Sequence, residues 1–290
     1  MKKRMWIYFV LIVLCMAVFF GYRTVKRLSA DTKAPQVNIS SAVQQVSVQA
    51  PKEALLQGIT AKDEADGDVT ASLVVESVRL LDSDGKATVS YAAFDRAGNV
   101  AKASSQVQYT DYESPRFSLD GPLVFAQNSS ADILSRIHVT DLIDGDITRR
   151  IRATSLAEDS ASNLGTHEVE LCVTNSLGDT AELTLPVEVY PVGTYQASVS
   201  LTDYLIYLPV GATFNPKDYL NSFSMGNETT SLENGIPKDL SLQTVGTVNT
   251  KIPGVYSVGY TVTYAVTNTG NPGESRTYSG YSKLIVVVED

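Results

Sequence analysis

Most of the chain alternates hydrophobic and polar residues with a period of two. Residues 87–93, 168–173 and 256–262 each place their apolar or aromatic side chains on one face. Such alternation is typical of antiparallel strands that bury one face. Gly, Asp, Asn and Pro separate these short runs, and no stretch after Ala30 repeats with a helical period. The pattern therefore predicts an all-β fold made of β-sandwiches.

The alternating runs fall into three groups, and each group ends on a strand of alternating or continuous apolar residues. These closing strands lie at residues 105–109, 185–190 and 284–288. A chain of 290 residues has room for two or three small domains. We therefore predict three tandem sandwiches, at residues 34–112, 113–191 and 192–290.

The N-terminal segment differs from the rest of the chain. Residues 5–22 contain no charged side chain and are almost entirely apolar. A helix of that length spans roughly 27 Å, close to the ~30 Å hydrocarbon core of a bilayer. Trp6, Tyr8 and Tyr22 stand near its ends, where interfacial aromatic residues are common. We predict a single transmembrane helix over 5–22, a cytoplasmic tail over 1–4, a stalk over 23–33, and extracellular C-terminal domains.

A cleaved signal peptide is the alternative for this segment. Its apolar stretch is typically ~7–15 residues and ends in small residues at the cleavage site. Here the apolar run is longer and Arg23 follows it at once. Leu28 also stands where a cleavage site requires a small residue. These features favour an uncleaved anchor.

An acidic motif occurs twice in the chain. Residues 59–70 and 137–148 align without a gap on Asp-x-x-Asp-Gly-Asp followed by Val or Ile and then Thr. A second motif, at residues 94–99 and 174–179, follows each copy. The offset between copies is nearly the same for the two motifs. Self-similarity at a near-constant period indicates an array of small domains.

These motifs resemble the Ig-like repeat of bacterial cell-surface proteins and of some pesticidal crystal proteins. The likeness rests on residues 66–70, 89–91 and 95–99 in the first copy and on 144–148 in the second. The third stretch shares only its strand at 254–262. The resemblance implies tandem Ig-like sandwiches at a cell surface, and such domains have no common catalytic activity.

The aspartates of the acidic motif have two interpretations. Carboxylate oxygens suit Ca²⁺, which takes six to eight hard oxygen ligands, although neither copy has the longer spacing and final Glu of an EF-hand loop. Asp-Gly is also a common turn, in which Gly supplies a positive φ and Asp accepts hydrogen bonds from nearby amides. We favour the turn and keep calcium as the alternative. The calcium candidates are Asp63, Asp66, Asp68, Asp141, Asp144 and Asp146, and a site shared with Asp111 and Glu113 is a weaker variant.

Charge and residue counts restrict the function. The N-terminal stretch 1–30 carries six basic and no acidic side chains, so the stretch 31–290 has a net charge of −15, given the total of −9. An acidic ectodomain argues against nucleic acid as a partner. With two histidines and one cysteine outside the apolar segment, zinc sites and Cys-His nucleophiles are disfavoured. We predict no enzyme activity, no catalytic residues and no cofactor apart from the calcium alternative.

Tyrosine is concentrated in the last third of the chain, where nine of the fifteen occur. Tyr256, Tyr260 and Tyr264 share a strand face with valines, which predicts a core face. The rigid, amphipathic tyrosine ring also suits recognition surfaces. We predict ligand contacts at Tyr219, Tyr278 and Tyr281, and a long polar loop over residues 214–235.

Together these features predict a membrane-anchored bacterial cell-surface protein that presents Ig-like domains for adhesion or ligand binding. Its expected partners are the membrane, through the N-terminal helix, and an extracellular protein or glycan. The alternative is a structural or accessory component of an envelope or polysaccharide assembly that binds no free ligand. The two differ in what residues 192–290 do.

Overall fold

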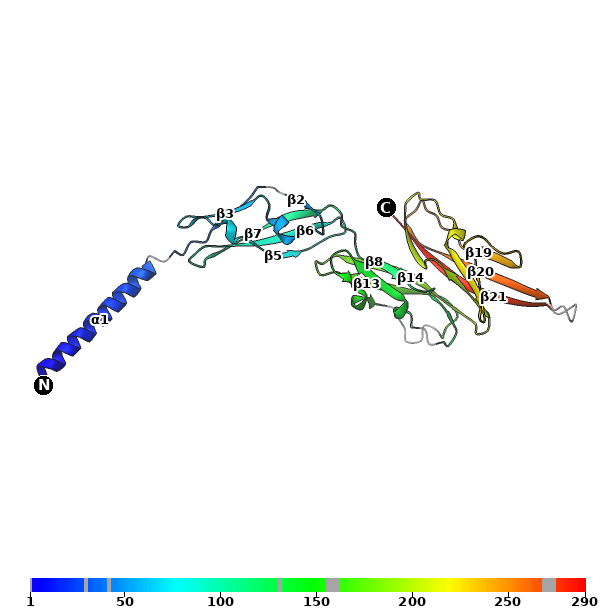
Figure 1. Ribbon diagram of the computed structural model, residues 1–290, viewed down its shortest axis with the longest axis horizontal. Coiled ribbons are helices and arrows are strands. Elements are labelled where there is room, and N and C mark those ends of the chain that lie inside the picture. The colour runs from blue at the N-terminus through cyan, green and yellow to red at the C-terminus, as the bar shows by residue number, and fades with distance from the viewer. Residues whose placement is uncertain (1, 29–30, 41–42, 130–131, 155–161, 268–274) are drawn as a thin grey trace. The chain divides into compact units, whose positions relative to one another are not determined.

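The computed structural model describes residues 2–28, 31–40, 43–129, 132–154, 162–267 and 275–290 (Figure 1). The chain divides into two compact units. One comprises residues 1–81 and 85–111, and the other comprises residues 82–84 and 112–290. The described residues form one long helix followed by β-sheets, which confirms the predicted all-β class behind a single N-terminal helix.

Helix α1 spans Lys2–Leu28 and is longer than predicted. The predicted tail from position 2 and the predicted stalk up to position 28 are helical too, because Arg, Lys and Leu are good helix formers and no proline interrupts them. Its segment Trp6–Thr24 has a mean hydropathy of 2.0, and none of it is buried against protein. By length and composition this segment is able to cross a membrane.

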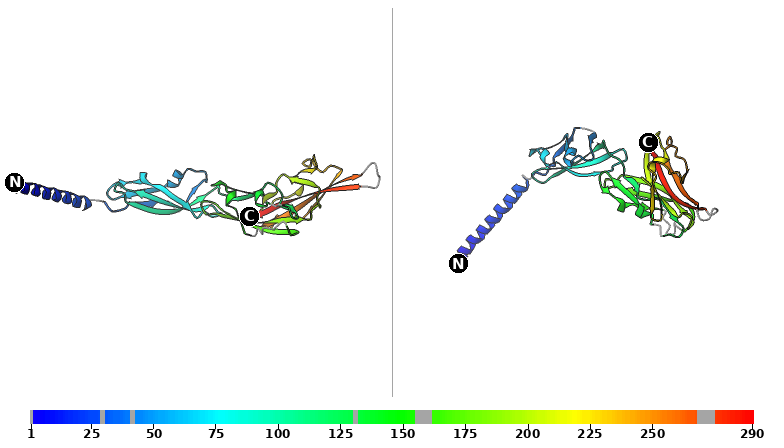
Figure 2. Two further views of the ribbon diagram at one scale, coloured as in Figure 1. Left: turned by 90° about the horizontal axis from the view of Figure 1, so that it is seen from below. Right: turned by 45° about the vertical axis from the view of Figure 1, so that its right-hand side comes forward.

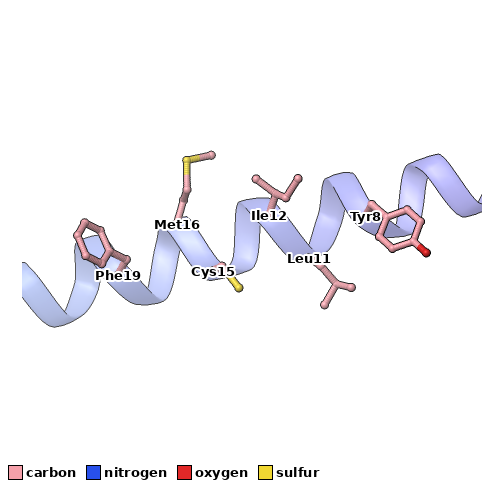
Figure 3. A pocket seen from close by; sticks show the side chains of 6 residues that line it. All are labelled: Tyr8, Leu11, Ile12, Cys15, Met16 and Phe19. Atoms are coloured by element: carbon pink, nitrogen blue, oxygen red, sulfur yellow. The ribbon is translucent and has the colours of Figure 1, made fainter.

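The side chains of α1 leave one apolar surface uncovered. Figure 3 shows six of them projecting from the helix, and they line a shallow hollow that is almost entirely apolar. The lining residues are Tyr8, Leu11, Ile12, Cys15, Met16 and Phe19. A hollow lined by apolar side chains offers few hydrogen-bond partners to a polar ligand.

The first sandwich packs a three-stranded sheet against a four-stranded sheet. The smaller sheet has the order β1 (Gln36–Ile39), β3 (Ile59–Asp63), β4 (Gly67–Asp68). The larger has the order β2 (Val43–Val46), β7 (Val100–Tyr109), β6 (Lys86–Phe94), β5 (Val74–Arg79). Two 3₁₀ helices, η1 (Lys52–Leu56) and η2 (Thr70–Ser72), connect strands.

The core of the first sandwich follows the predicted alternation. Ala87, Val89, Tyr91 and Ala93 of β6 are all at most 3% exposed. The Tyr91 hydroxyl lies 3.0 Å from the Ser105 hydroxyl, so the buried ring keeps a hydrogen bond for its polar end.

The second sandwich repeats the first, strand for strand. Its smaller sheet has the order β11 (Gly145–Asp146), β10 (Ile137–Asp141), β8 (Arg116–Leu119). Its larger sheet has the order β12 (Arg152–Ala153), β13 (Gly165–Thr174), β14 (Thr180–Tyr190), β9 (Val124–Ala126). The 3₁₀ helices η3 (Leu134–Arg136) and η4 (Thr148–Arg150) complete it. In both copies the second strand pairs in parallel with the last strand, β2 with β7 and β9 with β14.

The third sandwich is built around the hairpin of β20 (Gly254–Thr267) and β21 (Ser275–Glu289), the long orange and red arrows of Figure 2. Beyond β20 lies β19 (Leu240–Val245). Beyond β21 lie β15 (Ala197–Leu201) and β16 (Leu205–Pro209), which pair in parallel with its two halves. Strands β17 (Leu220–Met225) and β18 (Glu228–Ser231) extend the sheet from β15.

The predicted long loop over 214–235 is wrong. This segment contains the 3₁₀ helix η5 (Pro216–Tyr219) and the hairpin β17–β18. Leu220, Phe223 and Leu232 are buried, at 3%, 4% and 2% exposure, so a few apolar anchors hold a polar stretch in the sheet. The expected core face of β20 is confirmed, because Tyr260 is fully buried and Tyr256 and Tyr264 pack on the same core.

The second and third sandwiches share part of their hydrophobic cores. Leu205 of β16 and Ile285 and Val287 of β21 belong to the core cluster of the second sandwich. The neighbouring side chains on these strands face the core of the third sandwich, and they are Ile206, Leu284, Val286 and Val288. Because successive residues of a strand point to opposite faces, β16 and β21 contribute to both cores.

Candidate functional site

The first aspartate of each acidic motif organises a turn. Asp63 Oδ1 accepts hydrogen bonds from the amides of Ala65 and Asp66, at 2.8 and 2.9 Å. Asp141 Oδ1 does the same for Ile143 and Asp144, at 2.9 and 2.8 Å. The following glycines, Gly67 and Gly145, have φ values of +76° and +71°, as the turn requires. The turn interpretation is confirmed in both copies.

The second aspartate of each acidic motif, Asp66 or Asp144, accepts hydrogen bonds from the second motif at residues 94–99 or 174–179. Asp66 Oδ2 accepts a hydrogen bond from the Arg96 amide at 2.8 Å. Asp144 accepts from the amide and the hydroxyl of Ser176, both at 2.7 Å, and pairs with the Arg150 guanidinium. Burial acts to raise the pKa of Asp144, but the bonds from Ser176 and Arg150 outweigh it and hold the pKa below its ordinary value.

The third aspartate precedes a 3₁₀ helix. Asp68 accepts from the Thr70 amide and Asp146 from the Thr148 amide, each at 2.9 Å. The hydrogen bonds from these threonines lower the pKa of both carboxyl groups. In each copy the three aspartates predicted as calcium candidates therefore accept hydrogen bonds from three different parts of the backbone. Their carboxylates do not face one another as one set of ligands would.

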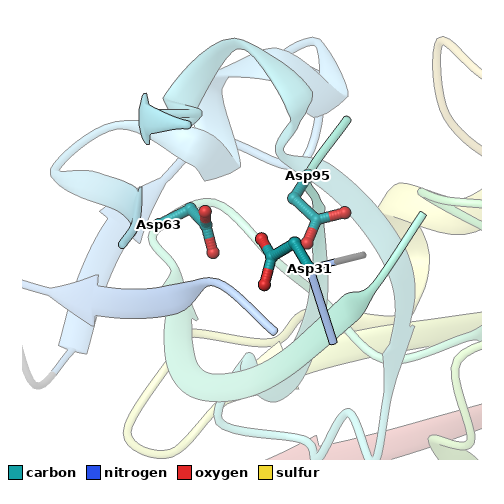
Figure 4. A group of neighbouring side chains, drawn as sticks. All are labelled: Asp31, Asp63 and Asp95. Atoms are coloured by element: carbon teal, nitrogen blue, oxygen red, sulfur yellow. The ribbon is translucent and has the colours of Figure 1, made fainter. Parts of the chain in front are cut away.

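One of them, Asp63, does join a carboxylate cluster with two other residues. Asp31, Asp63 and Asp95 each bring one carboxylate oxygen to within 4.8 Å of the others, and we call this set the three-aspartate cluster. Figure 4 shows the three carboxylates gathered at one end of the first sandwich, with Asp31 between Asp63 and Asp95 in that view. Asp31 lies on the segment that enters β1, Asp63 ends β3, and Asp95 follows β6.

Each aspartate of the cluster is oriented by the backbone through one oxygen. Asp31 Oδ1 accepts from the Lys33 amide at 3.0 Å, in addition to the turn bonds of Asp63. Asp95 Oδ1 accepts from the Asn99 amide and Oδ2 from the Asn99 side chain, both at 2.7 Å. Burial acts to raise the pKa of Asp95, but these Asn99 bonds and the amides of the same turn keep it lowered.

Among the residues that the structure describes, the remaining oxygens of Asp31 and Asp63 have no hydrogen-bond partner. Both Oδ2 atoms are buried, and the Asp63 side chain as a whole is only 8% exposed. Asn99 also donates to the backbone carbonyls of Asp31 and Lys33, each at 3.1 Å. The segment 31–33 is thus held against the first sandwich, with its carboxylate facing two others.

The second sandwich has a different set of residues in the corresponding place. Asp141 corresponds to Asp63, and Asn175 and Asp179 correspond to Asp95 and Asn99 of the first copy. The Tyr112 hydroxyl donates to Asp179 Oδ2 at 2.8 Å, and Asn175 donates to the Tyr112 oxygen at 2.8 Å and to Asp141 Oδ2 at 3.2 Å. Burial, together with Asp179, raises the pKa of Tyr112 far above its ordinary value, so the phenol keeps its proton. Here every inward-facing carboxylate oxygen named has a donor.

Sequence reasoning missed two members of the cluster. It assigned Asp31 to the stalk and read Asp95 only as part of a turn motif. A usable signal was Asp-x-x-x-Pro, which occurs at 31–35 and again at 111–115. In the second occurrence the Asp111 carboxylate does not join a cluster of this kind. It accepts hydrogen bonds from the Ser47 hydroxyl and the Val48 amide, at 2.6 and 2.8 Å. Asp111 is thus engaged in these two bonds, and the calcium site shared with Asp111 stays a prediction.

The three predicted ligand tyrosines are all half-buried rather than fully exposed. The Tyr281 hydroxyl donates to Glu188 of the second sandwich at 2.9 Å, and its ring stacks on Tyr195 with centroids 5.2 Å apart. Burial and the neighbouring Glu188 raise the Tyr281 pKa. Tyr219 stacks on Phe214, and Tyr278 pairs with Tyr264 across the β20–β21 hairpin. Tyr281 therefore lies at the junction between the second and third sandwiches. Ligand contact by any of the three tyrosines stays a prediction.

Polar residues complete the junction between the second and third sandwiches. Lys283, 6% exposed, pairs with Glu188. The Arg116 guanidinium lies over the Tyr207 ring, 4.4 Å from its centroid, and pairs with Glu289 at 2.5 Å. The shared core and these contacts make the two sandwiches a single compact unit.

Comparisons with known proteins give distant structural likeness alone. No family model matches the chain, and no curated protein does. A Clostridium perfringens ZmpB structure with CBM51-2, in complex with GlcNAc, and INT domains matches with 10% identity and a TM-score of 0.22, over 88% of this chain and 42% of that one. Protocadherin gammaB7 EC3-6 matches with 10% identity and a TM-score of 0.21, over 89% and 74%. PcdhgB3 EC1-4 matches with 13% identity and a TM-score of 0.23, over 88% and 76%. The chain thus spans less than half of the ZmpB chain, and scores this low assign no function.

Proposed function

We propose that this protein is held in the membrane of a bacterial cell by α1 and presents its Ig-like sandwiches outside the cell for adhesion or ligand binding. The ligand would be an extracellular protein or a glycan. In this proposal the first sandwich is a spacer, and the joined second and third sandwiches carry the recognition surface.

The observation that carries the anchoring is the exposure of α1. Its apolar side chains have no protein to cover them in the part of the chain that the structure describes, and Trp6, Phe9 and Phe20 are 71%, 65% and 61% exposed. An uncovered apolar surface of this extent is unfavourable in water. A bilayer removes that cost at ~25 cal/mol per Å² of apolar surface.

The third sandwich supports the recognition half of the proposal. Tyr219 and Tyr278 keep part of their rings at the surface. Strand β18 is exposed at every residue and lies at the end of its sheet, next to β17. Exposed tyrosine rings and a free sheet edge are two features that proteins use to bind partners.

The test uses the full chain in lipid nanodiscs on arrays of glycans and extracellular matrix proteins. The variants Tyr219→Ser, Tyr278→Ser and Tyr281→Ser should weaken binding, whereas the exposed Asp239→Asn should bind as the wild type does. The absence of binding above an empty-nanodisc control would contradict the recognition half. Extraction of the protein from membranes by alkaline carbonate would contradict the anchoring half.

A structural or accessory role in an envelope assembly is the second candidate. The junction supports it, since Tyr281, Glu188 and Lys283 fix the third sandwich onto the second without offering their polar groups to a ligand. Chemical crosslinking in intact cells separates the two candidates. Recovery of other envelope proteins, together with arrays that stay blank, would favour the structural role.

A further inference from the structure

The three-aspartate cluster brings three carboxylates together, and two of its oxygen atoms accept no hydrogen bond from the described residues. Three carboxyl groups approach within 4.8 Å, and Asp31 Oδ2 and Asp63 Oδ2 are buried without a hydrogen-bond donor from the described part of the chain. Like charges at this separation repel one another, and a buried carboxylate oxygen without a partner is costly. The oxygens that do have partners orient the side chains, so the two bare oxygens are held in place rather than free to turn to solvent.

We propose that the three-aspartate cluster is a Ca²⁺ site, in which the ion fastens the segment 31–33, which enters β1, to the first sandwich. Asp31 lies on that segment, shortly after the last residue of α1, while Asp63 and Asp95 lie on the sandwich itself. This inference is independent of the ligand-binding proposal, because it concerns the attachment of the first sandwich and not the recognition surface.

The second sandwich provides an internal comparison for this site. In place of Asp95 and Asn99 the second copy has Asn175 and Asp179, and the third residue at its shared aspartate is Tyr112, which follows Asp111, the sequence equivalent of Asp31. The phenol and the amide supply protons to the carboxylates, and the set carries two carboxylates instead of three. In the second sandwich, hydrogen-bond donors therefore reach the carboxylates at this place in the fold. In the first sandwich the described residues supply no donor to Asp31 Oδ2 and Asp63 Oδ2.

The ligand atoms select the ion. All three residues offer hard oxygen ligands, and no histidine or cysteine belongs to the cluster. Oxygen-only sites suit Ca²⁺ and Mg²⁺ and disfavour zinc and copper. Ca²⁺ accepts six to eight ligands in irregular geometry, including bidentate carboxylates, whereas Mg²⁺ demands a near-ideal octahedron. Three carboxylates from three separate segments match the requirements of Ca²⁺ better.

Lys33 is the neighbouring cation that could compete for this charge. Its ammonium bonds to Glu64 at 2.5 Å, and its side chain is 68% exposed. The Lys33 pKa is raised chiefly by Glu64 and to a smaller extent by Asp31 and Asp63. Lys33 is therefore paired with Glu64 rather than held by the three-aspartate cluster.

The experiment titrates the full chain, in detergent micelles, with CaCl₂ by isothermal calorimetry. One Ca²⁺ should bind per chain, with a Kd of about 10⁻³ M or tighter, the weak limit for extracellular calcium modules. Asp63→Asn should weaken binding at least tenfold, and the corresponding substitution in the second copy, Asp141→Asn, should leave it unchanged. Absence of saturable Ca²⁺ binding, equal affinity for MgCl₂, or full binding by Asp63→Asn would each overturn the proposal.

Thermal unfolding provides a second test, because it separates an effect of a substitution on calcium binding from an effect on stability. In EDTA, Asp63→Asn should match or exceed the wild-type Tm because carboxylate repulsion is relieved, and only the wild type should gain Tm on addition of CaCl₂. The double variant Asp31→Asn, Asp95→Asn removes two of the three carboxylates with little change in side-chain shape. It should fold and lose the calcium response. A wild-type Tm that is the same in EDTA and in CaCl₂ would overturn the proposal.

Discussion

The backbone amide of Phe117 in the second sandwich donates a hydrogen bond to the hydroxyl of Tyr207 in the third, at 3.2 Å. The Tyr207 ring also packs against the core of the second sandwich and lies under the Arg116 guanidinium. Burial raises the pKa of Tyr207, so the phenol stays protonated. One side chain thus joins two sandwiches by apolar packing, a cation–π contact and a hydrogen bond.

We expect Tyr207→Ala to destabilise the joined sandwiches by about 3 kcal/mol, because a large, mostly buried ring leaves a cavity. Tyr207→Phe should cost less, about 1–2 kcal/mol, since it keeps the ring and leaves only the Phe117 amide unpaired. Differential scanning calorimetry of the full chain should show the second and third sandwiches unfolding in one transition in the wild type and in two in Tyr207→Ala. A single unchanged transition in Tyr207→Ala would show that this contact does not couple them.

Lys283 and Glu188 form a largely buried pair, and removal of one partner should be costly. Lys283→Met keeps the apolar volume but leaves Glu188 with only the Tyr281 hydroxyl as a donor. We expect a loss of about 3 kcal/mol, near the lower end for broken buried pairs because Glu188 is 26% exposed. The exposed Lys238→Met is the matched control and should change the free energy of unfolding by less than ~0.5 kcal/mol. Equal effects of the two substitutions in urea unfolding would contradict this assignment.

Two glycines with similar backbone angles should respond differently to alanine. Gly246 and Gly211 have φ values of +104° and +84°, so alanine strains both by about 1–2 kcal/mol. A Cβ at Gly246 would also collide with the Ser257 carbonyl oxygen of β20, whereas a Cβ at Gly211 would meet nothing within 4 Å. Gly246→Ala should therefore cost about 1–3 kcal/mol more than Gly211→Ala. Equal melting temperatures for the two variants would show that β20 yields to the added methyl group.

Asp144 should contribute to the acid sensitivity of the second sandwich. Its folded-state pKa is lowered despite burial by Ser176 and Arg150, so its contribution to stability is fully present above the ordinary pKa of ~3.9 and is lost as pH falls through the lowered folded value. The stability difference between the wild type and Asp144→Asn should be constant from about pH 7 to 5 and shrink below about pH 4. The exposed Asp239→Asn should show no such convergence. A difference that stays constant down to pH 3 would contradict the role of the charge.

Particular residues show which parts of the fold the sequence predicted correctly and which it did not. Alternation located the strands correctly, because a half-buried strand needs an apolar side chain at every second position, as Val89 and Tyr91 show. The repeated Asp-Gly-Asp predicted both turns, because positive φ at Gly67 and Gly145 is a local requirement. The polar segment 214–235 misled the loop prediction, since its strands depend on a few buried residues, Leu220, Phe223 and Leu232.

The candidate site was harder to predict, since its residues are far apart in the sequence. Asp31, Asp63 and Asp95 belong to three separate segments, and only the folding of those segments to one end of the sandwich brings them together. The same holds for Tyr281, whose partner Glu188 lies in another sandwich.

The sequence alone therefore determined the apolar helix, the strand pattern, the turns and the duplication of the first sandwich in the second, because each depends on neighbouring residues or on a fixed period. Tertiary structure decided which aspartates face one another and which tyrosines belong to a junction. It also decided that β16 and β21 serve two cores. Those outcomes depend on contacts between distant segments, and local pattern carries no information about them.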